Sequence, residues 1–183
     1  MISDQELYIL SYYRACELAG AILFGKLAFH TNFENIRIPL TEHALEESRH
    51  AWRWTETIEK LGRIPLKVTQ AYQTEYGKEY GMPTSILEIL CLTQVFEKRT
   101  LDHFNKHLAL PGTHDLVKAT LQELIDDETG HVSWVRKELD DYIAKRDEEE
   151  INAVMKKMEE VDKKVFERLS KTEPFKEYFK ELL

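Results

Sequence analysis

Apolar residues recur at helical spacing along several long segments of the chain, and capping signals mark where these segments begin. The first predicted helix opens at Ser3, whose hydroxyl can accept a hydrogen bond from the backbone N–H of Glu6 in a capping box. The mostly polar residues 31–35 interrupt the pattern and predict a turn near Asn32. The periodic apolar positions of this helix include Leu10, Tyr13, Leu18 and Ile22.

The second predicted helix runs from about Ile38 to the stop signal Lys60-Leu61-Gly62. Pro39 is tolerated in its first turn, because the N–H that proline lacks would have no partner there. Residues 63–83 carry prolines and glycines that break the periodicity. We interpret them as a long crossover connection with at most short helical pieces.

Two more helices are predicted after this crossover. A second capping box, Ser85-Ile86-Leu87-Glu88, opens a helix that should end at Leu110, before Pro111-Gly112. The next helix begins at about Thr113 and fades in the charged segment 145–150.

A fifth helix is predicted at about 148–170, with Asp147 as its N-cap and an acidic first turn. The predicted fold is therefore all-α, with a four-helix bundle in residues 1–147 and a C-terminal helical extension in residues 148–183. One apolar stripe on the fifth helix indicates that it docks on the bundle or on another subunit. The stripe consists of Ile151, Val154, Met158, Val161, Val165 and Leu169.

The composition agrees with this fold class and restricts the kinds of partner that the protein is expected to bind. The 183 residues are 43% hydrophobic and 32% charged, with only seven glycines and five prolines, which favours long amphipathic helices over a turn-rich β fold. The net charge of -8 argues against nucleic acid as a partner. Cys16 and Cys91 are too few for a disulfide framework and are interpreted as core thiols. We expect a cytoplasmic protein without a membrane span, because no targeting signal and no long apolar run occurs.

Two copies of the motif Glu-x-x-His carry the candidate chemistry, Glu47-Ser48-Arg49-His50 and Glu128-Thr129-Gly130-His131. In a helix, positions i and i+3 lie on the same face one turn apart, so each motif can offer an oxygen and a nitrogen ligand together. One such tetrapeptide is weak evidence, because this spacing arises by chance in an acidic helical protein. The evidence becomes stronger because the two motifs stand at matching positions in the chain.

Each glutamate of these motifs has a counterpart at the same distance from a predicted turn. Glu17 and Glu47 are centred on Asn32, and Glu97 and Glu128 are centred next to Pro111-Gly112. About 15 residues correspond to roughly 22 Å of helix, so all four carboxylates should converge in the middle of the bundle. Buried carboxylates require protons or cations for neutralisation, and two divalent ions would balance four of them. The predicted ligands are Glu17, Glu47, His50, Glu97, Glu128 and His131.

With these motifs, residues 3–145 resemble the ferritin-like di-metal carboxylate superfamily, which includes bacterioferritins, rubrerythrins, ribonucleotide reductase small subunits and bacterial di-iron oxygenases. The resemblance implies a ferritin-like four-helix bundle and two iron ions, with manganese or a mixed pair as alternatives. It also implies that Glu47 and Glu128 bridge the metals. Glu17 and Glu97 would be terminal ligands, and His50 and His131 would each bind one ion.

Residues around the predicted ligands are candidates for supporting roles. Asp127 and Glu46 could orient the two histidines, although ordinary solvent-facing acids are an equal alternative for Glu46. Tyr13 and Thr100 share helix faces with Glu17 and Glu97. Trp54 and Trp134 are interpreted as core residues rather than as electron relays. The remaining histidines are predicted to lie on the surface: His30, His43, His103, His107 and His114.

The resemblance implies an oxidoreductase of the oxidase or hydroxylase type that uses O2 or peroxide. An organic substrate or a reductant protein would be its further partner, and a homodimer is possible. Ferroxidase or iron-storage activity and rubrerythrin-like peroxide reduction are the alternatives. The chain departs from rubrerythrin because it lacks the four-cysteine module, and because Gln94, not a glutamate, stands one turn before Glu97. A metal-free helical interaction protein is the remaining hypothesis.

Overall fold

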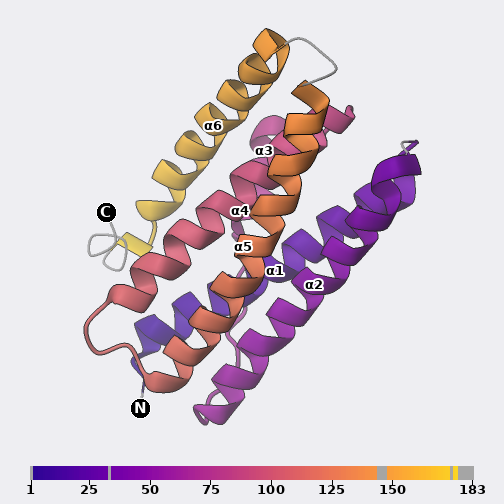
Figure 1. Cartoon of the computed structure of the whole chain (residues 1–183). Helices are drawn as coiled ribbons and strands as arrows, with labels where there is room; N and C mark the ends of the chain where they lie inside the picture. Colours follow the sequence, from indigo (N-terminus) through magenta and orange to yellow (C-terminus); the bar gives the residue numbers. More distant parts are fainter. Residues whose placement is uncertain (1, 33, 144–147, 174, 177–183) are drawn as a thin grey trace.

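The computed structural model describes residues 2–32, 34–143, 148–173 and 175–176, without the side chains of residues 35, 131–134 and 143. Over these residues the secondary structure is helical, which confirms the all-α prediction. The helices, shown in Figure 1, are α1 (Asp4–His30), α2 (Glu34–Lys60), α3 (Tyr72–Tyr80), α4 (Ile86–Ala109), α5 (Asp115–Ile143) and α6 (Glu148–Ser170).

Four of the long helices form two pairs, because α1 packs along α2 and α4 packs along α5 (Figure 1). Both pairs contribute to one apolar core, in which Tyr13, Trp54, Phe104 and Leu121 are buried. The short helix α3 and the C-terminal helix α6 pack against each other, α6 also contacts α4, and α3 contacts α1. The space between the two pairs holds the predicted ligands whose side chains the structure describes, the four glutamates and His50.

The predicted capping signals form in the structure. The Ser3 hydroxyl accepts from the Glu6 N–H at 3.0 Å, and the Ser85 hydroxyl accepts from the Glu88 N–H at 3.1 Å. At the end of α2, Gly62 has a φ of 72° and its N–H donates to the Glu59 carbonyl. This geometry stops the helix at the predicted position, since glycine adopts a positive φ without steric strain.

The predicted start of the second helix was wrong. The helix α2 begins at Glu34 rather than at about Ile38, so Pro39 lies inside the helix. Proline there removes one backbone hydrogen bond near the N-terminus, and the helix tolerates this loss because residues on both sides are packed. Ile36 and Leu40 are buried in a second apolar cluster with Phe24.

The structure of the crossover and of the C-terminal helix agrees with the prediction from the periodicity of apolar residues. Residues 63–83 contain one short helix, α3, whose Tyr72 and Tyr76 are buried. The helix α6 has the predicted bounds, and it docks on α3 and α4 of its own chain. The predicted N-cap Asp147 lies outside the described residues. The buried members of the predicted stripe are Ile151, Met158, Val165 and Leu169.

One helix, α1, is long and apolar enough to satisfy a membrane-span criterion, and half of its most apolar window is buried inside the protein. A core helix of a water-soluble fold passes the same test, so this finding is weak evidence for a membrane span. The thiols Cys16 and Cys91 are both free, Cys91 is buried and Cys16 is half-buried. The sulfur of Cys16 accepts from the Tyr72 N–H at 3.5 Å.

Candidate metal centre

The structure brings the four predicted carboxylates together between the two helix pairs. Glu17 comes from α1, Glu47 from α2, Glu97 from α4 and Glu128 from α5, and none is more than 4% exposed. Each lies near the middle of its helix, as its distance from the turns predicts. His50 on α2 joins them and is 3% exposed.

One group of candidate ligands joins α1, α2 and α5. The Nδ1 atom of His50 lies 2.9 Å from Glu128 Oε1 and 3.8 Å from Glu17 Oε2. One oxygen or nitrogen of each of these residues lies within 4.8 Å of the others. Three buried donors at this separation could hold a metal ion.

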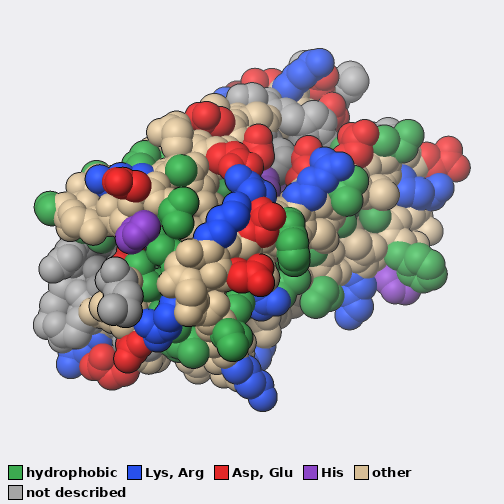
Figure 2. Space-filling model, turned by 90° about the horizontal axis from the view of Figure 1, so that it is seen from below, with side chains coloured by type: hydrophobic (Ala, Val, Ile, Leu, Met, Phe, Trp, Pro, Cys, Tyr) green, Lys and Arg blue, Asp and Glu red, His purple; other side chains and the backbone are tan. Residues whose placement is uncertain are grey.

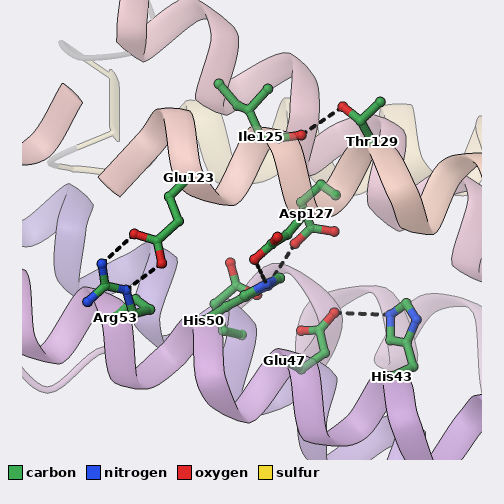
Figure 3. Close-up of polar contacts among 10 residues, drawn as sticks. His43, Glu47, His50, Arg53, Glu123, Ile125, Asp127 and Thr129 are labelled. Atoms are coloured by element: carbon green, nitrogen blue, oxygen red, sulfur yellow. Dashed lines mark hydrogen bonds and ion pairs between the residues drawn. The ribbon is translucent and has the colours of Figure 1, made fainter. Parts of the chain in front are cut away.

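A second group joins α2 to α4. The Nε2 atom of His43 lies 2.9 Å from Glu97 Oε1 and 3.2 Å from Glu47 Oε1, and all three residues are buried. Their ligand atoms also lie within 4.8 Å of one another. Figure 3 shows the rings of His43 and His50 on the same stretch of α2, with Glu47 between them.

The surface prediction for His43 was therefore wrong, as it was for His103 and His107, which are 5% and 1% exposed. The signal that locates His43 is its spacing. It stands four residues before Glu47 and seven before His50, so all three share one face of α2. A search limited to the Glu-x-x-His spacing does not find it.

His131 belongs to α5, but its side chain lies outside the described residues, as does that of Trp134. Its role as a ligand stays a prediction. Trp54 is fully buried and packs on Tyr13 at a centroid distance of 5.2 Å, which confirms it as a core residue.

Burial and mutual repulsion dominate the electrostatics of the carboxylates. Desolvation raises the pKa of Glu47 and Glu97 well above the ordinary value, and neighbouring carboxylates raise it further. Desolvation also raises the pKa of Glu17, with a partial offset from His50. For His50, burial lowers the pKa, but contacts with Glu128 and Glu17 outweigh burial and raise it to about 11. The site thus favours added positive charge, as protons or as metal ions.

Gly20 explains how α1 approaches Glu47 so closely. A Cβ atom at Gly20 would lie 2.2 Å from Glu47 Oε2, closer than any nonbonded contact allows. The glycine therefore leaves space for this carboxylate. Glu47 Oε2 is buried and has no hydrogen-bond partner among the described residues, so it is available to a cation.

The supporting residues lie around the two groups. Asp127 Oδ2 is 3.5 Å from His50 Nε2, whereas Glu128 contacts the other ring nitrogen, Nδ1. Tyr13 is buried one turn from Glu17, and its hydroxyl lies 3.3 Å from His107 Nδ1. Thr100 borders a small cavity of about 20 Å³ that Glu17 also lines.

A groove of about 600 Å³ opens between α2 and α5. In Figure 3, Glu123 and Asp127 extend from α5 toward Arg53 and His50 on α2. Arg53 Nε donates to Glu123 Oε1 at 2.7 Å, so this ion pair joins the two helices. The groove is also lined by Glu42, His43, Glu46, Arg49 and Gly130. Glu46, a candidate to orient a histidine, is half-buried. Because His43 and His50 both line the groove, the groove connects these two buried histidines with solvent.

Acidic and basic side chains alternate over the face of the molecule shown in Figure 2, with hydrophobic side chains between them. This mixed surface agrees with the modest net charge.

The fold and the site together define an all-helical protein with two buried His/Glu groups that could hold metal ions. No family model, curated protein or solved structure matches the chain.

Proposed function

We propose that the protein is a ferritin-like carboxylate protein that binds two iron ions and catalyses an O2- or peroxide-dependent oxidation. The observation that carries the proposal is the pairing of the two buried groups, Glu17–His50–Glu128 and His43–Glu47–Glu97. Each group combines carboxylate and imidazole donors, and each takes its imidazole from the same segment of α2.

The donor set fits iron in charge and in chemistry. Four carboxylates need about four positive charges, which two divalent ions supply without protonating the ligands. Carboxylate and imidazole donors suit iron and manganese, whereas the described donors include no thiolate of the kind that structural zinc sites use. Ferritin-like bundles use a Glu from each of two helices and Glu-x-x-His from each of the other two.

His43 modifies this pattern on α2. It would supply a nitrogen donor to the ion held by Glu47 and Glu97, while His50 would serve the ion held by Glu17 and Glu128. Glu47 and Glu128 are the proposed bridging carboxylates, on the strength of the resemblance. When bound, the two ions would supply redox chemistry with oxygen.

Other residues of the chain control the surroundings of the site. Asp127 would accept from the Nε2–H of His50 and hold the ring so that Nδ1 faces the carboxylates. Tyr13, Trp54 and Phe104 pack against one another on one side and exclude bulk water there. The α2/α5 groove would be the route for oxidant and substrate.

Metal analysis and rapid mixing test the proposal. Anaerobic loading with iron(II) should give about two ions per chain, and mixing with air should then produce a transient optical change. Glu47→Ala should abolish that change, whereas Glu59→Ala on the exposed face of α2 should retain it. Fewer than one ion per chain after loading, or an unchanged transient in Glu47→Ala, would contradict the proposal. Repetition with peroxide and with excess iron(II) separates an oxidase from a peroxidase and a ferroxidase.

A further inference from the structure

The α2/α5 groove has the dimensions of a small-molecule site rather than of an ion channel. Its volume is about 600 Å³, within the range of roughly 300–1,000 Å³ that ligand pockets occupy. His43 and His50 form part of its lining, and both belong to the proposed metal groups. A molecule in the groove would therefore lie directly against the redox site.

Gly130 supports a functional role for this space. Glycine inside a helix is less favourable than alanine by about 1 kcal/mol, so its presence there asks for a reason in packing or in function. Close packing against the described side chains does not explain this glycine, because a Cβ atom there would meet none of their atoms within 4 Å. Since Gly130 lines the groove, a larger side chain would project into the groove instead.

The ion pairs around the groove leave an excess of negative charge. Arg53 is held by Glu123 and by Glu56, with Arg53 Nη1 2.6 Å from Glu56 Oε2. The guanidinium of Arg53 is thus already neutralised by carboxylates of the protein. It lines the groove but is not available to an anionic ligand.

The other charged side chains of the groove are mostly acidic. Glu42, Glu46 and Asp127 line it, with Asp127 in contact with the His50 ring, and Arg49 is the remaining arginine or lysine among the described lining. Trp52 is 57% exposed at the edge of the groove and offers an indole face to a cation or to an apolar body. This combination favours a ligand with a positive group and a carbon skeleton.

We infer that the groove binds a small organic amine and that Gly130 sets the size of molecule it admits. The ammonium group would lie among Glu42, Glu46 and Asp127, and the carbon skeleton would lie along Trp52 toward the two histidines. This inference rests on the proposed function in one respect, because the amine is a substrate only if the metal groups bind redox ions. Binding itself does not depend on that function.

Three probes of similar size and different charge test the inference: phenethylamine, 2-phenylethanol and 3-phenylpropionate. Binding to the purified full chain is followed by NMR through the amide signal of Gly130 and the indole signal of Trp52, with metal content measured in the same sample. We expect phenethylamine to bind at least about tenfold more tightly than 3-phenylpropionate, with a preference that falls as salt is added. Equal affinities of the three probes would overturn the amine assignment.

Variants locate the binding. The double variant Glu42→Gln, Glu46→Gln should remove most of the preference for the amine, whereas Glu59→Gln, which removes a charge from the same helix outside the groove, should preserve it. Gly130→Leu should weaken all probes by at least about tenfold, and Gly130→Ala should melt no lower than the wild type. Unchanged probe binding in a folded Gly130→Leu protein, or in the double variant, overturns the location.

The metal content separates this inference from the proposed function. Amine binding in a chain that takes up no iron supports the groove and contradicts the proposed function. A chain that takes up two iron ions and binds none of the probes contradicts the groove inference alone. Uptake of many iron ions per chain without probe binding would identify iron itself as the substrate and would also overturn the inference.

Discussion

The ring of His43 reaches across the molecule from α2 to α4, where its Nε2 atom lies 2.9 Å from Glu97 Oε1. The contact joins the two helix pairs at the level of the buried carboxylates. Because Glu47 Oε1 is also only 3.2 Å from the same nitrogen, one imidazole serves a carboxylate from each pair. This relationship makes His43 as central to the site as His50.

We expect His43→Ala to retain one tightly bound ion and to bind the second at least about tenfold more weakly, since a nitrogen donor is lost from only one group. Titration of the metal-free protein with iron(II) under anaerobic conditions measures both affinities. His30→Ala is the matched control, because His30 is exposed at the end of α1. Two ions bound with wild-type affinity in His43→Ala would show that His43 is not a ligand.

Gly20→Ala should disturb the site through Glu47. The new methyl group would meet the carboxylate at 2.2 Å, so either Glu47 rotates or α1 shifts outward. Relative to Gly25→Ala, which gains the same helix propensity, we expect a free energy of unfolding lower by about 1–3 kcal/mol, and weaker metal binding. Denaturant unfolding and metal titration measure these effects.

Gly25→Ala is the control on the same helix, because its Cβ would make only an ordinary 4.0 Å contact with Ala44. Alanine is the better helix former, so this variant should be at least as stable as the wild type. Equal behaviour of the two alanine variants would mean that the close approach of α1 to Glu47 has no energetic consequence.

Local signals in the sequence account for most of the helix boundaries. Ser3, Ser85 and Gly62 act within one turn of the chain, so their hydrogen bonds follow from neighbouring residues alone. The start of α2 does not follow in this way. Tertiary packing of Ile36 and Leu40 extends the helix to the N-terminal side of Pro39. This packing outweighs the local preference of proline for the first turn of a helix.

In the candidate site, too, some residues could be predicted from the sequence alone and others could not. Glu17, Glu47, Glu97 and Glu128 converge because antiparallel helices bring together residues that are equidistant from a turn, and this rule needs only the sequence. His43 required knowledge of which face of α2 is buried. Burial depends on how the two helix pairs pack, which the motif spacing does not specify.

Buried His107 should make the protein sensitive to acid. Desolvation lowers its pKa to about 4 from the ordinary 6.5, so the unfolded chain takes up a proton in this range while the folded protein does not. The contribution of His107 to stability is therefore complete above about pH 6.5 and is lost as the pH falls toward 4, by at most about 1.4 kcal/mol per pH unit.

The variant His107→Gln should make this dependence less steep, as measured by denaturant unfolding at several pH values between 4 and 7. Part of the slope remains, because burial also lowers the pKa of His103, to about 3. His30→Gln changes an exposed histidine and should leave the slope unaltered. A wild-type slope in His107→Gln would show that other groups cause the loss of stability in acid.

Asp162 fastens α6 to the rest of the molecule, and its removal should loosen that helix. Its carboxylate accepts from the Tyr72 hydroxyl at 2.6 Å and from Arg99 Nε at 2.9 Å, which ties α6 to α3 and α4. Asp162→Asn leaves the half-buried Arg99 with only the longer 3.7 Å contact to Asp102, so we expect a loss of about 1–3 kcal/mol in the free energy of unfolding and faster proteolysis within α6. The exposed Glu160→Gln on the same helix should change neither. If Asp162→Asn unfolds and is cleaved like the wild type, the apolar stripe of α6 alone holds it in place.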